Sequence, residues 1–229
     1  MKITWIGQSG YVIKTAQAEI IIDPYLSDVV NRVAGRERLV EAPIKPEEIR
    51  ADAVICTHNH LDHLDTDAID EMDKTLLYIT TREGELVLKN KGCTNVVAFR
   101  EGESLQIKDV KLTAVYACHT VEAFGVVLQA EGLTLYFSGD TLYDEKLFDI
   151  SRFSPDCTFI CINGKLGNMN VAEAVITAKK IGAKVNVPNH YGMFASNTED
   201  PELFTDQMDN GLIMELGKEY SLIDNFVFN

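Results

Sequence analysis

Alternation of apolar and polar residues begins at the start of the chain and predicts three short strands, because successive side chains of a strand point to opposite faces. These strands are expected around Ile3–Ile6, Tyr11–Thr15 and Glu19–Ile22. The next stretch, residues 25–50, is polar and weakly patterned, with two runs that could form helical turns. We expect it to cross the surface near whatever site the fold builds.

Beyond residue 50, apolar runs of strand length alternate with helical spacing. Strands are expected at Ala53–Thr57, Leu76–Ile79, Thr158–Ile162 and Val185–Pro188, and in succession from Asn95 to Ser138 with a hairpin at Glu131-Gly132. Helices are expected at Asp67–Met72, Arg82–Asn90, Val171–Ile181 and Pro201–Asp209. Mixed elements with a β-rich middle predict an α/β (α+β) fold in which helices pack outside two sheets.

The composition indicates the number of domains. Of the 229 residues, 46% are apolar and 24% charged, as in ordinary globular proteins. No Pro/Gly/Ser-rich linker, low-complexity segment or repeat divides the chain. We therefore predict one domain over residues 1–229, large enough to bury a sizeable core.

The net charge of the chain restricts which classes of molecule are expected as partners. Asp and Glu total 35 against 21 Lys and Arg, a net charge of −14 that repels phosphate backbones and anionic membrane surfaces. We expect neither nucleic acid nor membrane as a partner, and the sequence leaves open whether the chain forms a homo-oligomer. The chain has no apolar run of membrane-spanning length and begins without a signal peptide, so we expect a cytoplasmic protein. Five cysteines without a CxxC pair suggest no disulfide framework and no cysteine zinc site.

Ligand-capable residues follow the apolar runs. Such residues would lie at strand ends, where sheets of this kind commonly build sites. All five histidines belong to this set, because His60 and His63 lie in the segment that begins at His58. The residues that follow six of the runs are Asp23, His58, His119, Asp140, Asn163 and His190.

The run from Thr57 to His63, with the sequence THNHLDH, is the strongest local signal. Its three imidazoles and one carboxylate could not all be buried without a large desolvation cost, and together they suit a borderline divalent cation. His58 and His60 can point the same way from an extended segment, while Asp62 and His63 can address a second ion. His119 and His190 can add nitrogen ligands. The two oxygens of Asp140 could bridge ions ~3.5–4 Å apart, although an Asp beside a glycine is also a common turn residue.

With these residues in place, the sequence resembles the metallo-β-lactamase superfamily of metal-dependent hydrolases. The resemblance rests on the HxHxDH motif followed in order by H, D and H, and it covers nearly the whole chain. It implies a four-layer αββα sandwich with a two-metal site at one edge of the sheets. It also implies that Asp23 supports the loop that carries the run from Thr57 to His63, which we call the histidine loop. The ligand sets that it implies are His58, His60 and His119 for the first ion, Asp62, His63 and His190 for the second, and Asp140 between them.

Two segments resemble the L-ascorbate-6-phosphate lactonase group, residues 163–174 and residues 187–194. One departure concerns the glycine turn Trp5-Ile6-Gly7-Gln8, where many relatives carry a histidine after WxG. Whether Gln8 and residues 25–50 contribute to the site is left open.

The resulting hypothesis is a hydrolase in which a hydroxide held by two divalent ions opens a small lactone or ester, with or without a phosphate. Zinc or manganese suits the ligands, and iron remains open. Asp62, Asp140 and His190 are the expected catalytic residues. Alternatives are a phosphodiesterase or nuclease of the same fold, which the charge disfavours, and an iron-dependent oxidoreductase.

The substrate is expected to be a small, anionic molecule. The loop before the helix at Val171 would bind it through Asn163, Lys165 and Asn168, because a helix N-terminus favours an anion. The alternative is that Asn170 caps the helix and Lys165 points to water.

Overall fold

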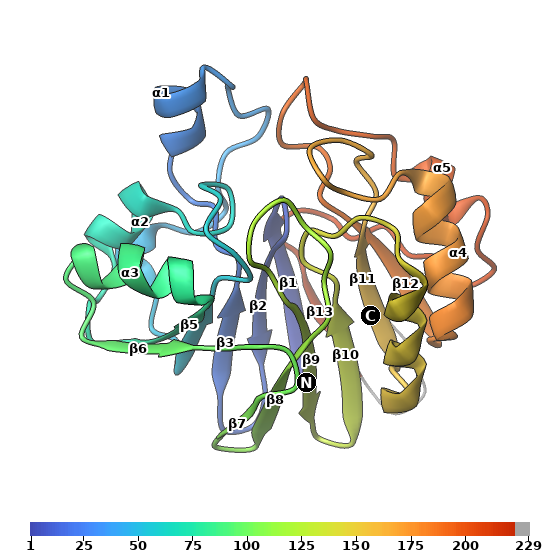
Figure 1. The fold of residues 1–229 in the computed structure, drawn as a ribbon, viewed down its shortest axis with the longest axis horizontal. Helices are drawn as coiled ribbons and strands as arrows, with labels where there is room; N and C mark the ends of the chain where they lie inside the picture. The colour runs from blue at the N-terminus through green and yellow to red at the C-terminus, as the bar shows by residue number, and fades with distance from the viewer. Residues whose placement is uncertain (223–229) are drawn as a thin grey trace.

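The computed structural model describes residues 1–222, and its centre is a sandwich of two mixed β-sheets (Figure 1). Residues 223–229, the end of the predicted domain, lie outside the described residues. The first sheet has the strand order β13-β1-β2-β3-β4-β5-β6. Its strands are β1 (Lys2–Gly7), β2 (Gly10–Lys14), β3 (Glu19–Ile22), β4 (Ala53–Ile55), β5 (Leu77–Thr80), β6 (Asn95–Ala98) and β13 (Glu219–Ser221).

The second sheet has the order β12-β11-β10-β9-β8-β7. Strands β10, β11 and β12 are parallel, and β9 runs antiparallel to both β8 and β10. The carboxyl ends of β8, β10, β11 and β12 therefore lie at one edge. The strands are β7 (Ser104–Ile107), β8 (Val110–Val115), β9 (Gly125–Ala130), β10 (Leu133–Phe137), β11 (Cys157–Cys161) and β12 (Val185–Asn189).

Helices cover the outer faces of both sheets, which gives the four layers that the resemblance implies (Figure 1). The α+β sandwich is thereby confirmed. On the first sheet lie α2 (Thr66–Glu71) and α3 (Arg82–Asn90), and on the second lie α4 (Val171–Ile181), α5 (Glu202–Thr205) and the 3-10 helix η2 (Glu145–Phe153). Helix α1 (Val29–Ala34) stands above the sandwich, and the 3-10 helix η1 (Pro46–Glu48) follows it in the chain.

The continuous apolar run of β3 is explained by burial on two faces. Ile20 and Ile22 pack into the core between the sheets, whereas Ile21 packs with the helix-facing cluster that includes Leu64, Ile69 and Leu88. In the central core, Phe137 and Phe159 are stacked, with ring centroids 4.4 Å apart.

Some predicted elements differ from the structure. The helices at Arg82–Asn90 and Val171–Ile181 have the expected bounds, and two helical turns do form within residues 25–50. The expected helix at Pro201–Asp209 is wrong in length, because after Thr205 the chain turns through i→i+3 hydrogen bonds. The elements η2 and β13 are not among those predicted from the sequence. Within residues 1–222, none of the helices has the length and apolar character needed to cross a bilayer.

Candidate metal centre

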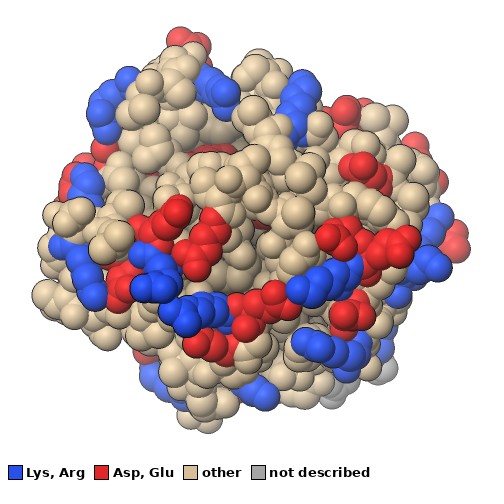
Figure 2. All heavy atoms as spheres, viewed as in Figure 1, with Lys and Arg blue, Asp and Glu red and all other residues tan. Residues whose placement is uncertain are grey.

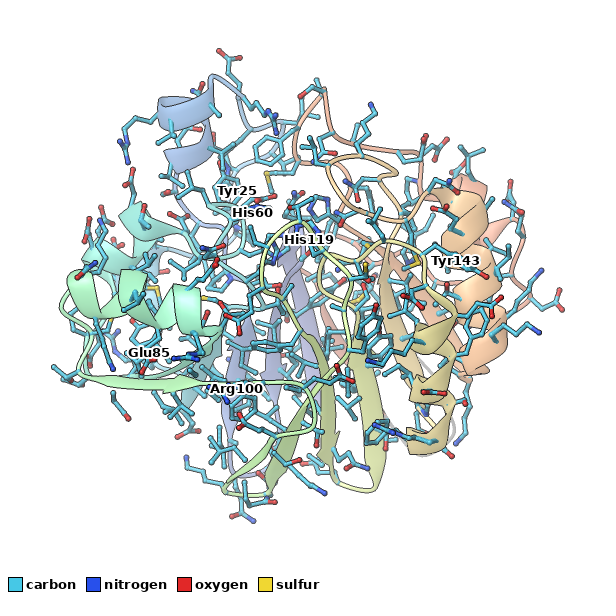
Figure 3. All side chains as sticks on the ribbon, viewed as in Figure 1. Tyr25, His60, Glu85, Arg100, His119 and Tyr143 are labelled. Carbon is cyan, nitrogen blue, oxygen red and sulfur yellow. The ribbon has the colours of Figure 1, made fainter. Side chains whose placement is uncertain are left out.

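The candidate site lies where the carboxyl ends of strands from both sheets meet, at the top of Figure 1. Strands β3 and β4 are parallel, with Ile22 opposite Ile55, so Asp23 and the loop after Cys56 leave the first sheet at the same edge. Across the sandwich, His119, Asp140 and His190 follow β8, β10 and β12. Figure 3 shows His60 and His119 close together at this edge, although 59 positions separate them in the chain.

Three imidazoles form the first ligand set. His60 Nδ1 lies 3.0 Å from His58 Nε2 and 3.2 Å from His119 Nε2, and all three atoms lie within 4.8 Å of one another. The other ring nitrogen of His119, Nδ1, lies 3.0 Å from the carbonyl oxygen of Gly167, to which it can donate. Outward hydrogen bonding of this kind leaves the second nitrogen free to hold an ion.

Asp62, His63 and His190 form the second set. His190 Nε2 lies 3.5 Å from Asp62 Oδ2, and His63 Nε2 lies 3.9 Å from the same oxygen. Asp140 lies between the sets, with Oδ1 3.2 Å from His63 Nε2 and Oδ2 3.9 Å from His119 Nε2. The seven residues predicted as ligands are therefore brought together, in the grouping that the resemblance implies.

Asp23 holds the histidine loop from below. Its carboxylate accepts hydrogen bonds from the backbone N–H and hydroxyl of Thr57, both at 2.7 Å, and lies 2.8 Å from His63 Nδ1. With Nδ1 committed to Asp23, His63 presents Nε2 to the site. Asp23 and His190 both adopt left-handed backbone conformations, with φ of 44° and 61°. Such strain is typical of sites that the surrounding fold over-determines.

The protein's own groups perturb one another strongly here. Burial, aided by His63, holds the pKa of His58 well below its ordinary value, so its ring is a neutral donor of a lone pair. Burial also opposes protonation of His190, but Asp140 and Asp62 outweigh it and raise the pKa to about 9. Burial opposes ionisation of Asp62 as well, yet His63 and His190 hold the pKa of its carboxyl below the usual range.

Two buried atoms at the centre of the cluster fit a metal centre. His63 Nε2 and Asp140 Oδ1 are buried and have no hydrogen-bond partner among the described residues, although they face each other. An orphaned pair of this kind is costly unless something else satisfies it. Neutral imidazole and carboxylate are the ligands that zinc and similar divalent ions prefer, so the residues present fit such ions.

Gln8 belongs to the site, a role that the sequence left open. Its side-chain Nε2 donates to Asp62 Oδ2 at 2.7 Å and lies 3.1 Å from His190 Nε2, while Oε1 is buried and has no partner within residues 1–222. Gln8 adopts φ of 51° directly after Gly7, which has φ of 100°. The tight turn at the end of β1 thus directs a buried amide at two atoms of the second set.

A cavity of about 540 Å³ opens beside the candidate metal ligands. Its walls come from α1 and its C-terminal turn, the histidine loop, the loop before α4 and the loop after β12. In Figure 2 the surface is hollowed beneath α1, with Lys or Arg side chains on both walls. The lining residues are Val30, Ala34, Arg36, Asn59, His60, Leu61, Asp62, Thr120, Asp140, Leu166, Gly167, His190, Phe194 and Asn197.

The wall formed by α1 has its own small core. Tyr25, Val29 and Val30 pack against Met193 and Phe194 in a cluster separate from the two cores of the sandwich. We call this cluster the α1 core. It joins residues 25–50 to the loop after β12, and so this weakly patterned stretch does contribute to the cavity.

The residues predicted to bind substrate lie elsewhere. Asn163 and Asn168 are buried, with Asn168 Nδ2 donating to Asn163 Oδ1 at 3.0 Å and Asn163 Nδ2 donating to Asn197 Oδ1 at 2.8 Å. Lys165 is exposed and donates to the carbonyl oxygen of Ser196. None of the three lines the cavity, which this loop reaches through Leu166 and Gly167 instead. The amide network gives Asn163 and Asn168 a structural role.

The helix after this loop begins as the alternative predicted. Asn170 caps α4 by accepting from Glu173 N–H at 3.0 Å, and Glu173 accepts in turn from Asn170 N–H at 2.9 Å. These bonds occupy amides that an anion would need.

Sequence reasoning also missed Asp65, which caps α2 and accepts from the backbone N–H groups of Leu26 and Ser27 at 2.9 and 2.7 Å. An Asp immediately before a helix was the available signal. Asp65 thereby ties the residues that lead into α1, which we call the α1 segment, to the end of the histidine loop.

The sequence is similar to a known domain family and to individual metal-dependent hydrolases. The Beta-lactamase superfamily domain matches residues 18–191. The UPF0173 metal-dependent hydrolase YtkL of Bacillus subtilis is 30% identical over an alignment of 240 positions, which covers 97% of this chain and 100% of YtkL. Another UPF0173 metal-dependent hydrolase, from Oenococcus oeni, is 29% identical over 241 residues, with 96% and 99% covered.

Solved structures share the fold. An isothiocyanate hydrolase from Delia radicum gut bacteria superposes with a TM-score of 0.81 at 22% identity, and a possible metal-dependent hydrolase from Veillonella parvula with 0.83 at 18%. Each comparison covers 97% of this chain and 99% of the other. The diiron β-hydroxylase CmlA from Streptomyces venezuelae has a TM-score of 0.73 at 13% identity, over 96% of this chain and 54% of CmlA. Because the domain match spans most of the chain and YtkL is 30% identical over nearly all of it, this chain belongs to the β-lactamase superfamily and, within it, to the UPF0173 metal-dependent hydrolases.

Proposed function

We propose that this metal-dependent hydrolase holds two divalent ions and cleaves a small lactone or ester. The observation that carries the proposal is the pair of three-residue ligand sets with Asp140 between them, in which His63 Nε2 and Asp140 Oδ1 are buried without partners. His58, His60 and His119 would hold one ion, and Asp62, His63 and His190 the other. Asp140 Oδ2 lies 3.3 Å from His190 Nε2 and 3.9 Å from His119 Nε2, so this carboxylate contacts both sets and is suited to bridge them.

When bound, two such ions supply a water of lowered pKa as the nucleophile, and their positive charge stabilises the substrate oxygen on which negative charge develops. The chain's own residues complete the chemistry. Asp62 and His190 line the cavity beside the second set. As water adds to the carbonyl carbon, Asp62 would accept its proton. When the ester C–O bond breaks, the proton would pass to the departing alkoxide oxygen.

The choice of a lactone or ester over a nucleic acid is supported by size and charge. A cavity of about 540 Å³ suits a small molecule, and the net charge of −14 opposes a polyanion. The resemblance to the ascorbate-6-phosphate lactonase group favours lactones. Ions of zinc or manganese suit the ligands best, and iron would also be held.

Metal analysis and a substrate panel test the proposal. Protein purified without added metal, and protein reconstituted with zinc or manganese, should contain two ions per chain by elemental analysis. The same samples are assayed on γ- and δ-lactones, 4-nitrophenyl esters, bis(4-nitrophenyl) phosphate and an isothiocyanate. Cleavage of lactones or esters supports the proposal, whereas cleavage confined to the phosphodiester or the isothiocyanate would overturn it.

Asp140→Asn provides the matched variant. It keeps the shape of the side chain but removes the charge between the sets, so we expect loss of at least one ion and a fall in turnover of about a hundredfold or more. Asp209→Asn, at an exposed turn, should behave as the wild type. Full metal content and full turnover in Asp140→Asn would remove this residue from the site.

A further inference from the structure

We infer that Arg36 binds an anionic group, a carboxylate or a phosphate, on the substrate of this site, and that the rest of that substrate is apolar. The inference rests on the proposed function in taking the cavity beside the metal ligands as the place of reaction. Arg36 lines that cavity together with His60, Asp62 and Asp140. It follows Gly35, whose left-handed conformation ends α1 and turns the chain.

The guanidinium of Arg36 differs from those of its neighbours in having no hydrogen-bond or ion-pair partner among the described residues. Within residues 1–222, the structure gives it neither an ion pair nor a hydrogen bond, although it is only partly exposed. Arg32 makes a two-pronged contact with Asp67, at 2.9 and 2.6 Å. Arg38 donates to backbone carbonyls and lies over the ring of Tyr25. In a chain with 35 acidic residues, an unpaired guanidinium facing a cavity is available to an external anion.

The backbone around Arg36 is anchored on both sides. Helix α1 is packed into the α1 core through Val29 and Val30. Beyond Arg36, the N–H of Leu39 donates to the carbonyl oxygen of Met193 at 2.8 Å, which ties the segment to the loop after β12. The guanidinium is thus presented from a fixed backbone, and a rigid position reduces the entropy lost on binding.

The remaining walls describe the rest of the ligand. Val30 and Ala34 from α1 face the same cavity as Leu61, Leu166 and Phe194. These side chains can bury a hydrocarbon portion, and the other lining residues outside the ligand cluster, Asn59, Thr120, Gly167 and Asn197, carry no charge. The cavity thus offers the candidate ligands, an apolar wall and Arg36. A substrate that fits all three has a scissile carbonyl at the candidate ligands, an apolar body and a terminal anion at Arg36. The fork of five N–H donors suits a carboxylate or phosphate oxygen pair.

Three esters that differ only at the far end test the inference. They are the mono-4-nitrophenyl ester of glutarate, the 4-nitrophenyl ester of 4-phosphonobutyrate and the neutral 4-nitrophenyl valerate. In the zinc-loaded enzyme, Arg36→Met should raise KM for the better of the two anionic esters by roughly ten- to a hundredfold and change that for the valerate less than about twofold. The ester with the larger effect tells carboxylate from phosphate. Arg32→Met, in which the lost arginine pairs with Asp67 on the surface, should leave all three unchanged.

A binding measurement separates this inference from the proposed function. Titration calorimetry of glutarate and of 4-phosphonobutyrate into zinc-loaded protein needs no turnover. If none of the esters is cleaved but one anion binds the wild type at least tenfold more tightly than Arg36→Met, the inference stands and the ester proposal falls. Equal affinity in the two proteins, or equal changes in KM for charged and neutral esters, would overturn the role of Arg36.

Discussion

At the scale of single residues, the site depends on side chains that a motif does not reveal. Gln8 is the clearest case, because an ordinary polar residue in a glycine turn contacts two atoms of the second ligand set. Its amide fixes the orientation of Asp62, and residues that orient metal ligands typically change metal affinity 10–100-fold when they are replaced.

Gln8→Met should therefore weaken one of the two ions and spare the other. The variant keeps the length of the side chain and removes the 2.7 Å hydrogen bond to Asp62. We expect the affinity for one ion to fall by roughly tenfold or more in competition with a chromogenic chelator. Gln17→Met, at an exposed position of the β2–β3 turn, serves as the control. If both ions keep wild-type affinity, Gln8 does not support the site.

At the scale of elements, loops rather than strands carry the ligands, so backbone geometry in the loops controls the site. Gly167 illustrates this. It has φ of 93°, its carbonyl oxygen is the partner of His119 Nδ1, and a Cβ added to it would lie 2.9 Å from that nitrogen.

Gly167→Ala should displace His119 and weaken the first ligand set. We expect a fall of about tenfold in affinity for one ion, measured by chelator competition, together with a modest loss of stability. Gly132→Ala is a matched control, because Gly132 also has positive φ, at 77°, but a Cβ there would meet nothing within 4 Å. A variant at Gly167 that differs from wild type no more than the Gly132 control would contradict this account.

Asp65 links two elements and should matter for stability. Its carboxylate caps α2 through the N–H groups of Asp67 and Ala68, and also binds two backbone N–H groups of the α1 segment. Asp65→Ala should lower the free energy of unfolding by about 2–4 kcal/mol in urea denaturation, because buried donors lose their acceptor. Asp67→Ala, which removes an exposed ion pair with Arg32, should cost about 1 kcal/mol or less.

At the scale of the whole molecule, the ions and the fold should stabilise each other. In metal-free protein, His190 has a pKa of about 9 against an ordinary 6.5, because Asp140 and Asp62 outweigh its burial. A group whose pKa is raised on folding contributes stability that is fully present below pH 6.5 and is lost as the pH rises to 9. Thermal unfolding of metal-free protein should therefore show a falling midpoint over this range.

Zinc-loaded protein should not show the same loss, because an imidazole that holds an ion carries no second proton to release. Its midpoint should also be higher than that of the metal-free form at each pH, since a ligand at a hundred times its Kd adds about 2.7 kcal/mol. Metal-free His190→Gln should lose part of the pH dependence. A metal-free midpoint that is flat or rises from pH 6.5 to 9 would refute the assignment of the proton to this group.

Much of this organisation could be predicted from the sequence, for identifiable reasons. The central strands and the helix at Val171–Ile181 follow from apolar periodicity and caps, and the seven ligands follow from their rare residue types at strand ends. Arg36 and Gln8 could not be found in this way, because only tertiary packing decides which ordinary polar residue faces a cavity. Likewise β13 is three residues long, and it owes its conformation to pairing with β1.

The separate packing of the α1 core has a consequence for engineering. Val30 and Phe194 line the cavity and pack with Val29, yet these residues share no cluster with the two cores that hold the sheets together. Residues of α1 and the turn after it can therefore be varied in a library without disturbing the cores of the two sheets. Such a library would change the shape of one side of the cavity, while the sheets that position the candidate ligands keep their packing.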